Sequence, residues 1–491
     1  MTTTHTQMRN LIVASALAVT AVACKQSDID ITNPNVALAG AVASDPTALQ
    51  LLATGLIVDQ RATRSAQITN VGTLGREMYT YTPQEGRNTT HFLQGITVGN
   101  KQELDPTGFA NGSWSGQYSL LRDSYNFKNT VNAAASLTAA QKSASLGFAE
   151  TLDALMIFEI VQTRDSLGGL TQINDNPFVL AAFVSRDSMY KYVLNTLDDA
   201  ATKLAGGGTA FPFTLSPGFA GFNTPATFLL FNRALKGKAA AHYATRGGGS
   251  AAWQAALTAL SASFLNASAT TRAQFDVGVY DTYAPAPDTP NPLTQATNTN
   301  LYAHMSIQAD AQLKANGQPD DRYTAKIRTG LPSRQGPTAN NLPTSAPSTL
   351  GFSIWPTQSS TIPVLRNEEL ILLRAEAKLG TGDKAGAIAD LNIVRQNSGG
   401  LPASTLTAAS SDDAVITGIL YEKRYSLLME GDRWVDMRRY GKLDLLPLDI
   451  PSGPNKNFVA KVMPVPQAEC LNRLSLSAEF LGPNGLNDCA P

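Results

Sequence analysis

The segment from residue 366 to residue 399 has the pattern of two helices joined by a tight turn, and it constrains the fold more than any other feature. Gly380 is placed to end the first helix and Asp383 to cap the second. Apolar residues recur at helical spacing on both sides of the turn, at Leu370, Leu373, Ala377, Ala387, Leu391 and Val394. One helical hairpin cannot bury its own apolar face, so the pattern requires stacked neighbours.

Comparable helical patterns occur along most of the chain. They cover residues 45–64, 118–137, 139–162, 185–204, 224–246 and 251–265. The first has Asp45 as its expected N-cap and Pro46 at its first helical position. The hairpin at 366–399 resembles a tetratricopeptide unit, with Gly382 in its turn and the small residue Ala387 on its second helix. The sequence therefore predicts a mostly α fold of stacked, tetratricopeptide-like helical hairpins.

Two segments interrupt this helical rhythm. Residues 76–116 are rich in Gly, Thr, Asn and aromatic residues, and residues 275–363 are rich in Pro, Thr, Asn and Ser. An irregular stretch as long as 275–363 is typical of a functional insertion or of disorder. We therefore predict an N-terminal helical part at 45–274, a loop-rich insertion at 275–363 that is the candidate ligand region, and a C-terminal helical part at 364–491.

The N-terminus has the pattern of an export signal. Arg9 precedes an apolar run from Leu11 to Ala23 that is too short to span a bilayer and ends in small residues. The motif "AVAC" is typical of a lipoprotein signal, in which Cys24 is acylated after removal of residues 1–23. Residues 24–44 then form an extended tether, and acyl chains on one cysteine provide the anchor.

The remaining cysteines, Cys470 and Cys489, lie close together near the C-terminus. An exported protein can keep disulfides, so these two cysteines form a possible bridge, with two free thiols as the alternative. The four histidines lie far from them in sequence and show no ligand spacing, so no metal site is expected.

The stretch from Ser426 to Lys442 concentrates charge around a tryptophan. Glu430, Arg433, Asp436 and Arg439 follow one another at intervals of three, which suits pairing on one helical face. We predict a helix from Val415 to Tyr440 with a local break. Arginines at this spacing lower the pKa of the neighbouring acids and keep them ionised, whereas a glycosidase needs one carboxyl group with a raised pKa. A nucleic-acid patch would need a clear excess of arginine. The pattern therefore favours a structural role for this stretch, in which paired charges surround a buried Trp434.

Composition and motifs exclude several other functions. The formal net charge of −1 argues against nucleic acid as a partner. The sequence contains no H-E-x-x-H, no G-x-S-x-G, no phosphate-binding loop and no dinucleotide fingerprint, so we expect neither a cofactor nor enzymatic activity.

Several motifs together resemble the SusD/RagB family of outer-membrane nutrient-binding lipoproteins. The stretch "YEKRYSLLMEGDRWVDMRRYGKL" is similar to the family's C-terminal signature. The residues that carry this match are Glu422, Arg424, Glu430, Gly431, Arg433, Trp434, Asp436 and Arg439. Glu369, Arg374, Glu376, Asn392 and Arg395 match a second family helix pair, and "VMPVPQAECLNR" resembles the closing motif. Ser426 and Leu427 depart from the usual pattern.

The resemblance implies a function. A family member is anchored by lipid at the outer membrane, faces the cell exterior, and binds a nutrient, most often an oligosaccharide. It delivers the nutrient to a SusC-like TonB-dependent β-barrel transporter. The identity of the ligand, glycan or peptide, is left open by this sequence.

Ligand contacts are expected from the two loop-rich segments, because sites often lie on loops held by a rigid scaffold. The candidates are Tyr79, Tyr81, Arg87 and Asn88 in the first segment and Tyr280, Tyr283 and Trp355 in the second, with His91 and Tyr302 beside them. Trp114 precedes a helix and is expected to be structural.

Two alternatives remain. A helical-repeat scaffold that binds a peptide or protein would use the helix surfaces rather than the insertion. A secreted glycan hydrolase would need a carboxylate pair in the loops, from Glu77, Glu85, Glu103 or Asp105.

Overall fold

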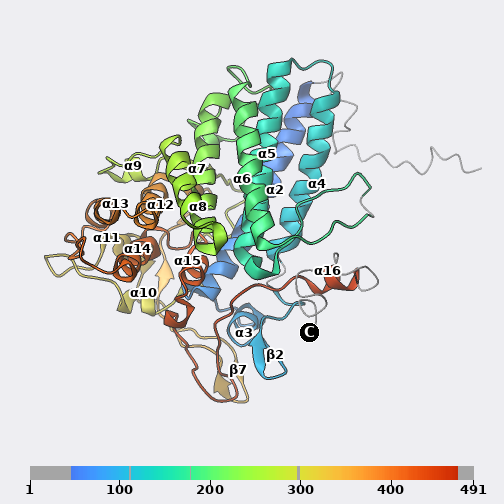
Figure 1. Cartoon of the computed structure of the whole chain (residues 1–491). Helices are drawn as coiled ribbons and strands as arrows, with labels where there is room; N and C mark the ends of the chain where they lie inside the picture. The colour runs from blue at the N-terminus through green and yellow to red at the C-terminus, as the bar shows by residue number, and fades with distance from the viewer. Residues whose placement is uncertain (1–45, 110–111, 177–178, 296–298, 474–491) are drawn as a thin grey trace, which may run out of the picture.

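The computed structural model describes residues 46–109, 112–176, 179–295 and 299–473 (Figure 1). Long helices dominate this part of the chain, and the predicted mostly α fold of stacked helical hairpins is confirmed. Cys24, the signal segment, the tether and Asp45 lie outside the described residues, as does Cys489.

The N-terminal part is a row of four long helices, α2 (Pro46–Leu74), α4 (Gly112–Ala133), α5 (Ala139–Arg164) and α6 (Arg186–Ala205), which lie side by side in Figure 1. Helix α5 is the central one, since it packs on both α4 and α6 and is buried along nearly all of its second half. Thr138 and Ser185 cap α5 and α6 with their hydroxyl oxygens, which fixes where each helix begins.

Helix α2 is longer than the sequence predicts. The expected helix ends at residue 64, whereas the observed helix continues to Leu74. Threonines have low helix propensity, but Thr69 and Thr73 donate their hydroxyl hydrogens to the carbonyl oxygens of Ser65 and Thr69, one turn earlier. Tertiary packing then buries Val71 and Leu74 completely, so burial outweighs the weak local preference.

The stack continues through α7 (Pro225–Tyr243), α8 (Gly249–Ser261), α12 (Asn367–Gly380) and α13 (Lys384–Asn397). Helix α12 packs on α8 as well as on α13, so the C-terminal hairpin joins the N-terminal row. The predicted hairpin is confirmed: α12 ends at Gly380, and Asp383 accepts a hydrogen bond from the backbone N–H of Gly386. A side chain at Gly380 would lie 2.3 Å from Nε1 of Trp253, so glycine permits the close approach of α8.

Residues 275–363 contain only short elements within their described part. These are β4 (Gly278–Asp281), β5 (Leu301–Ala303), α10 (Ser306–Ala309), α11 (Asp321–Lys326), β6 (Ile327–Arg328), β7 (Thr338–Ala339), β8 (Leu342–Pro343) and β9 (Gly351–Phe352), with β10 (Ile362–Arg366) at the end. Strand β4 pairs with β10, β6 with β9 and β7 with β8, all antiparallel. Buried side chains such as Trp355 and Phe352 share a small core with Ile68, Met78 and Tyr425 from outside this region.

The predicted loop at 76–116 also holds short elements, β1 (Met78–Thr80), α3 (Arg87–Leu93) and the hairpin of β2 (Ile96–Val98) with β3 (Lys101–Glu103). The remaining helices of the described chain are α9 (Arg272–Phe275), α14 (Asp412–Ser426), α15 (Arg433–Arg439) and α16 (Gln467–Leu471), with short turns of helix at 165–167, 217–219, 244–248 and 443–445. The predicted break in the helix 415–440 is confirmed, because Met429 and Gly431 have positive φ between α14 and α15.

Candidate functional site

The charged C-terminal signature lies in the interior of the protein. Asp436 accepts hydrogen bonds from Lys423 Nζ at 2.9 Å and from Arg439 Nε at 2.8 Å. Glu376 of α12 binds the same two cations, with Lys423 Nζ at 3.0 Å. Burial opposes ionisation of Asp436, but Lys423 and Arg439 outweigh it and hold the pKa of Asp436 below its ordinary value. These four groups therefore form a compensated ion cluster that joins α12, α14 and α15.

The predicted pairing of Arg433 with Glu430 and with Asp436 along one helix face is wrong. Glu430 lies in the break and pairs with Arg366 of β10, whose Nη2 is 2.6 Å from Glu430 Oε1. Arg433 donates to the carbonyl oxygen of Leu420 and forms no ion pair within the described chain. The positive φ of Gly431 turns the chain here, so residues on its two sides do not share a helix face.

The same signature anchors the loop-rich segment to the helices. Glu422 of α14 lies 2.7 Å from Arg322 of α11. Arg424 lies 2.6 Å from Asp310 and donates to Ser306 Oγ at 2.7 Å. Because removal of one partner would leave buried charge uncompensated, these contacts fix where the segment lies. In this structure the signature residues Glu422 and Arg424 hold the loop-rich segment against the helices.

Most of the predicted aromatic ligand residues are packed inside the protein. Tyr79, Tyr81 and Trp355 are 1%, 3% and 2% exposed, and Tyr283 is also buried. A sugar ring needs an open aromatic face, so the geometry does not support stacking on these four side chains. Tyr280 is half-buried and lines a separate groove of about 490 Å³, together with Phe222 and Phe264.

The structure nevertheless brings the two predicted segments together. Strand β1 pairs antiparallel with β5, and Tyr79 lies opposite Tyr302 in the register. The Tyr81 ring lies 5.5 Å from the Tyr302 ring, and the Tyr81 hydroxyl donates to the carbonyl oxygen of Ala346 at 2.7 Å. The buried tyrosines thus join the two segments rather than contact solvent.

A cavity of about 260 Å³ lies next to this junction, between α2, β1 and α3. Its lining is formed by Thr69, Asn70, Thr73, Thr80, Asn88, Phe92, Phe109 and Leu301. Hydroxyl and amide groups share its wall with Phe92 and Phe109, a combination that suits polar ligands with an apolar face. We refer to this cavity as the Asn88 cavity. Of the sequence candidates, Asn88 lines it directly.

Arg87 lies at the start of α3, next to Asn88. Its guanidinium lies 5.2 Å from the centre of the Phe109 ring and binds Glu85, with Nε 2.8 Å from Oε1. The hydrogen bonds from Arg87 lower the pKa of Glu85 to about 2, so this carboxylate is ionised at neutral pH. The His91 ring lies 5.3 Å from Phe109, and its partial burial lowers its pKa, which favours the neutral imidazole.

Sequence reasoning missed the contribution of α2 to the Asn88 cavity. Thr69, Asn70 and Thr73 lie on one face of this helix because they are spaced by three and four residues. This polar stripe was visible in the sequence, but the helix was expected to end before it. Phe109 was also missed, since a single phenylalanine in a loop carries no pattern.

The carboxylates that a hydrolase would need are not assembled into a pair at the Asn88 cavity. Glu77 is 1% exposed, and desolvation raises its pKa to about 8 although Arg433 opposes the shift. The Glu77 carboxyl is therefore protonated at neutral pH, and a substrate cannot reach it. Glu85 is held ionised by Arg87, and Glu103 lies on β3 in the lining of a different cavity.

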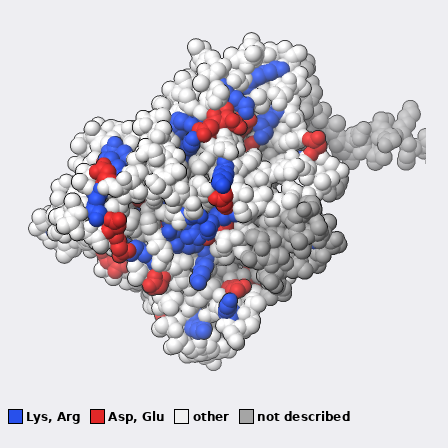
Figure 2. All heavy atoms as spheres, viewed as in Figure 1, with Lys and Arg blue, Asp and Glu red and all other residues white. Residues whose placement is uncertain are grey.

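Charge on the surface is mixed. On the face shown in Figure 2, most groups of Lys and Arg atoms lie close to Asp or Glu atoms, and broad areas carry no charge. No helix among the described residues is long and apolar enough to cross a membrane. The same part of the chain contains no group of three or more His, Cys, Asp or Glu residues that could hold a metal ion. Cys470 is buried and disulfide-bonded, and its predicted pairing with Cys489 stays a prediction.

Comparison with solved structures shows that the fold is SusD-like. A SusD-like protein from Bacteroides fragilis superimposes with a TM-score of 0.63 at 15% identity, covering 90% of this chain and 97% of that chain. A laminarin-binding SusD-like protein gives 0.59 at 16% identity, covering 86% and 97%. A SusD-like carbohydrate-binding protein from Bacteroides fragilis gives 0.58 at 14% identity, covering 88% and 99%.

The sequence supports the same assignment. Residues 274–469 match the model of the SusD family, whereas no curated protein sequence matches the chain. This match and the SusD-like fold are two separate similarities of the chain to the SusD/RagB family. The matched range includes the whole buried signature, whose Glu422 and Arg424 hold the loop-rich segment on the helices.

Proposed function

We propose that the protein is a cell-surface lipoprotein that binds a glycan at the Asn88 cavity. The observation that carries this proposal is the convergence of the two loop-rich segments, through the β1–β5 pair, beside a cavity lined by hydroxyl, amide and aromatic side chains. Two proteins of similar fold are named for binding laminarin and carbohydrate, which supports a glycan as ligand. Arg87, whose guanidinium lies over the ring of the lining residue Phe109, adds donors for sugar hydroxyl groups.

The proposal extends to delivery. Lipid on Cys24 would hold the protein at the outer face of the outer membrane, and a tethered binder needs a pore to pass its ligand inward. The partner expected from the family is a SusC-like TonB-dependent β-barrel. Recovery of such a barrel with the lipidated protein in mild detergent would support delivery, and repeated recovery of the protein alone would contradict it.

The binding step is tested with protein that begins after residue 24. A glycan array followed by calorimetry identifies the ligand, with laminarin as the first probe. Asn88→Ala and Phe109→Ala should each weaken binding about tenfold, the effect of losing one hydrogen bond or one packed ring face of roughly 1.4 kcal/mol. Lys191→Ala changes an exposed residue on α6 and serves as the control. Unchanged affinity in both cavity variants would place the ligand elsewhere.

A further inference from the structure

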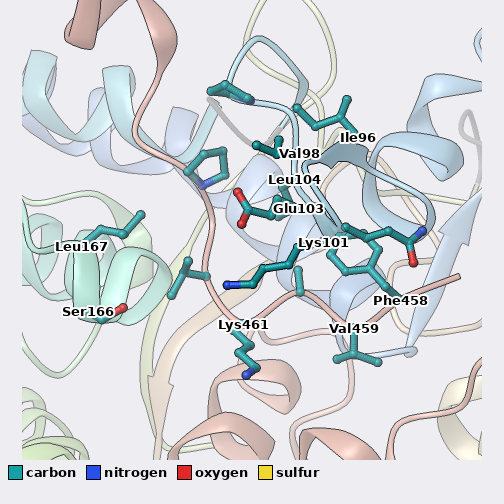
Figure 3. Close-up of a pocket in the computed structure, with 15 residues that line it drawn as sticks. Ile96, Val98, Lys101, Glu103, Leu104, Ser166, Leu167, Phe458, Val459 and Lys461 are labelled. Carbon is teal, nitrogen blue, oxygen red and sulfur yellow. The ribbon is translucent and has the colours of Figure 1, made fainter. Parts of the chain in front are cut away.

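A second cavity, larger than the Asn88 cavity, lies elsewhere in the described chain. It has a volume of about 690 Å³ and lies between the β2–β3 hairpin, the turn at Ser166 and Leu167, and the chain from Phe458 to Pro464 (Figure 3). Its volume is within the range of binding sites for small molecules and peptide segments. We call it the hairpin cavity.

Its walls are aliphatic rather than aromatic. Apart from Phe458, the apolar lining comes from Ile96, Val98, Leu104, Pro106, Leu167, Val459, Ala460, Val462 and Pro464. Flat sugar rings are usually bound on open aromatic faces, whereas branched aliphatic walls accept aliphatic side chains. This composition favours a peptide over a glycan.

The charged groups of the hairpin cavity have no partners in the described chain. Lys101, Lys461 and Glu103 are exposed, line the cavity, and form no ion pair or side-chain hydrogen bond with another described residue. In Figure 3 the side chains of Lys101 and Glu103 extend from the hairpin toward the side of Ser166 and Leu167. Because the two lysines outnumber the single glutamate, the cavity favours a ligand with acidic groups.

The backbone N–H groups of one wall also lack partners, whereas the carbonyl oxygens of Ala460 and Lys461 accept from Trp434 and Arg438. Phe458 donates its N–H to the Leu93 carbonyl oxygen at 2.8 Å, and Met463 donates to Thr163 at 3.0 Å. Between these two anchors, no backbone N–H from residue 459 to residue 462 donates to another described residue. A segment fixed at both ends with unpaired N–H groups can hydrogen-bond to the backbone of a bound peptide.

We propose that the hairpin cavity binds an extended, acidic peptide segment of another protein. The peptide backbone pairs with the N–H groups of residues 459–462 and with the carbonyl oxygens of Val459 and Val462. Its aliphatic side chains contact Val98, Leu167 and Val462, and its carboxylates lie against Lys101 and Lys461. The three features that carry this assignment, namely aliphatic walls, unpaired lysines and unpaired backbone amides, are independent of the Asn88 cavity and of the glycan function.

The test uses a fluorescein-labelled peptide of alternating valine and glutamate and the protein beginning after residue 24. Saturable binding in fluorescence anisotropy is expected, with about tenfold weaker binding for Lys101→Glu because a close charge pair becomes repulsive. Lys456→Glu is the matched control, since this exposed lysine is nearby but does not line the cavity. A valine–lysine peptide and a peptide N-methylated at alternate residues should bind poorly.

Several outcomes would overturn the proposal. They are no saturable binding, equal loss in the Lys101→Glu and Lys456→Glu variants, or full binding of the N-methylated peptide. Competition by laminarin would show that the probe reports the glycan site instead. Binding that appears only after removal of residues 474–491 would identify the chain's own C-terminal segment, rather than another protein, as the occupant.

Discussion

Replacement of Trp434 by alanine should destabilise the protein strongly without a direct effect on the Asn88 cavity. The Trp434 side chain is fully buried in the cluster that includes Val71, Leu391 and Met463. Its Nε1 donates to the Ala460 carbonyl oxygen at 2.8 Å. Removal of the ring leaves a cavity between α15 and its neighbours and an unpaired buried carbonyl.

The expected magnitude follows from these contacts. Truncation of a buried tryptophan costs about 3–5 kcal/mol, and the unpaired carbonyl of Ala460 adds about 1 kcal/mol. The Arg438 guanidinium lies 4.5 Å from the ring centre, and loss of this contact adds a further ~1 kcal/mol. Since such losses are not additive, we expect about 4–6 kcal/mol in total. Trp434→Phe, which keeps most of the ring and loses the N–H, should cost about 1–2 kcal/mol.

Urea unfolding followed by circular dichroism measures these differences at a fixed pH, and calorimetry with the identified glycan measures binding below the unfolding transition. The architectural role predicts reduced stability and near wild-type affinity in the folded fraction. An unchanged unfolding midpoint combined with lost binding would refute the reasoning and make Trp434 a ligand residue.

Three further perturbations test the remaining conclusions. Arg366→Met should cost about 3–5 kcal/mol in urea unfolding because it leaves the buried acids Glu368 and Glu430 without their shared cation, and a loss below 1 kcal/mol would contradict this. The Glu77 carboxyl keeps its proton in the folded protein up to pH about 8 but loses it near 4.5 when unfolded, so its contribution to stability falls as the pH rises between these values. Glu77→Gln should therefore gain stability relative to the wild type from pH 5 to pH 8, and a constant difference would show that this carboxyl does not titrate there. Cys24→Ser should abolish labelled palmitate incorporation, and equal labelling would remove the lipid anchor from the proposal.

The helical framework was predictable because its signals are local. The turn at Gly382, the cap at Asp383 and the end of α12 at Gly380 act over a few residues, so the sequence predicted the hairpin correctly. The break between α14 and α15 was predictable for the same reason, since Gly431 interrupts an otherwise regular helical pattern.

The partners of the charged side chains were not predictable in the same way. Spacing along the sequence correctly paired Asp436 with Arg439, but Glu430 binds Arg366, which lies 64 positions away in the sequence. Long-range pairing depends on how α12, α14 and β10 pack, and no local pattern encodes that arrangement.

The sequence by itself determined the helix periodicity, the hairpin turns, the burial of Trp434 and the resemblance to a family, because each depends on the order of apolar, small and charged residues over short spans. Only the tertiary structure decided which loop residues face solvent. Tyr79 and Tyr81 are aromatic residues of the kind that stack on sugar rings, yet the β1–β5 pair turns their rings into the interior. Asn88 and the α2 threonines instead line the cavity, because the packing of α2 against β1 and α3 places their polar groups at its wall. Exposure is set by contacts between segments far apart in the chain, and therefore by the fold as a whole.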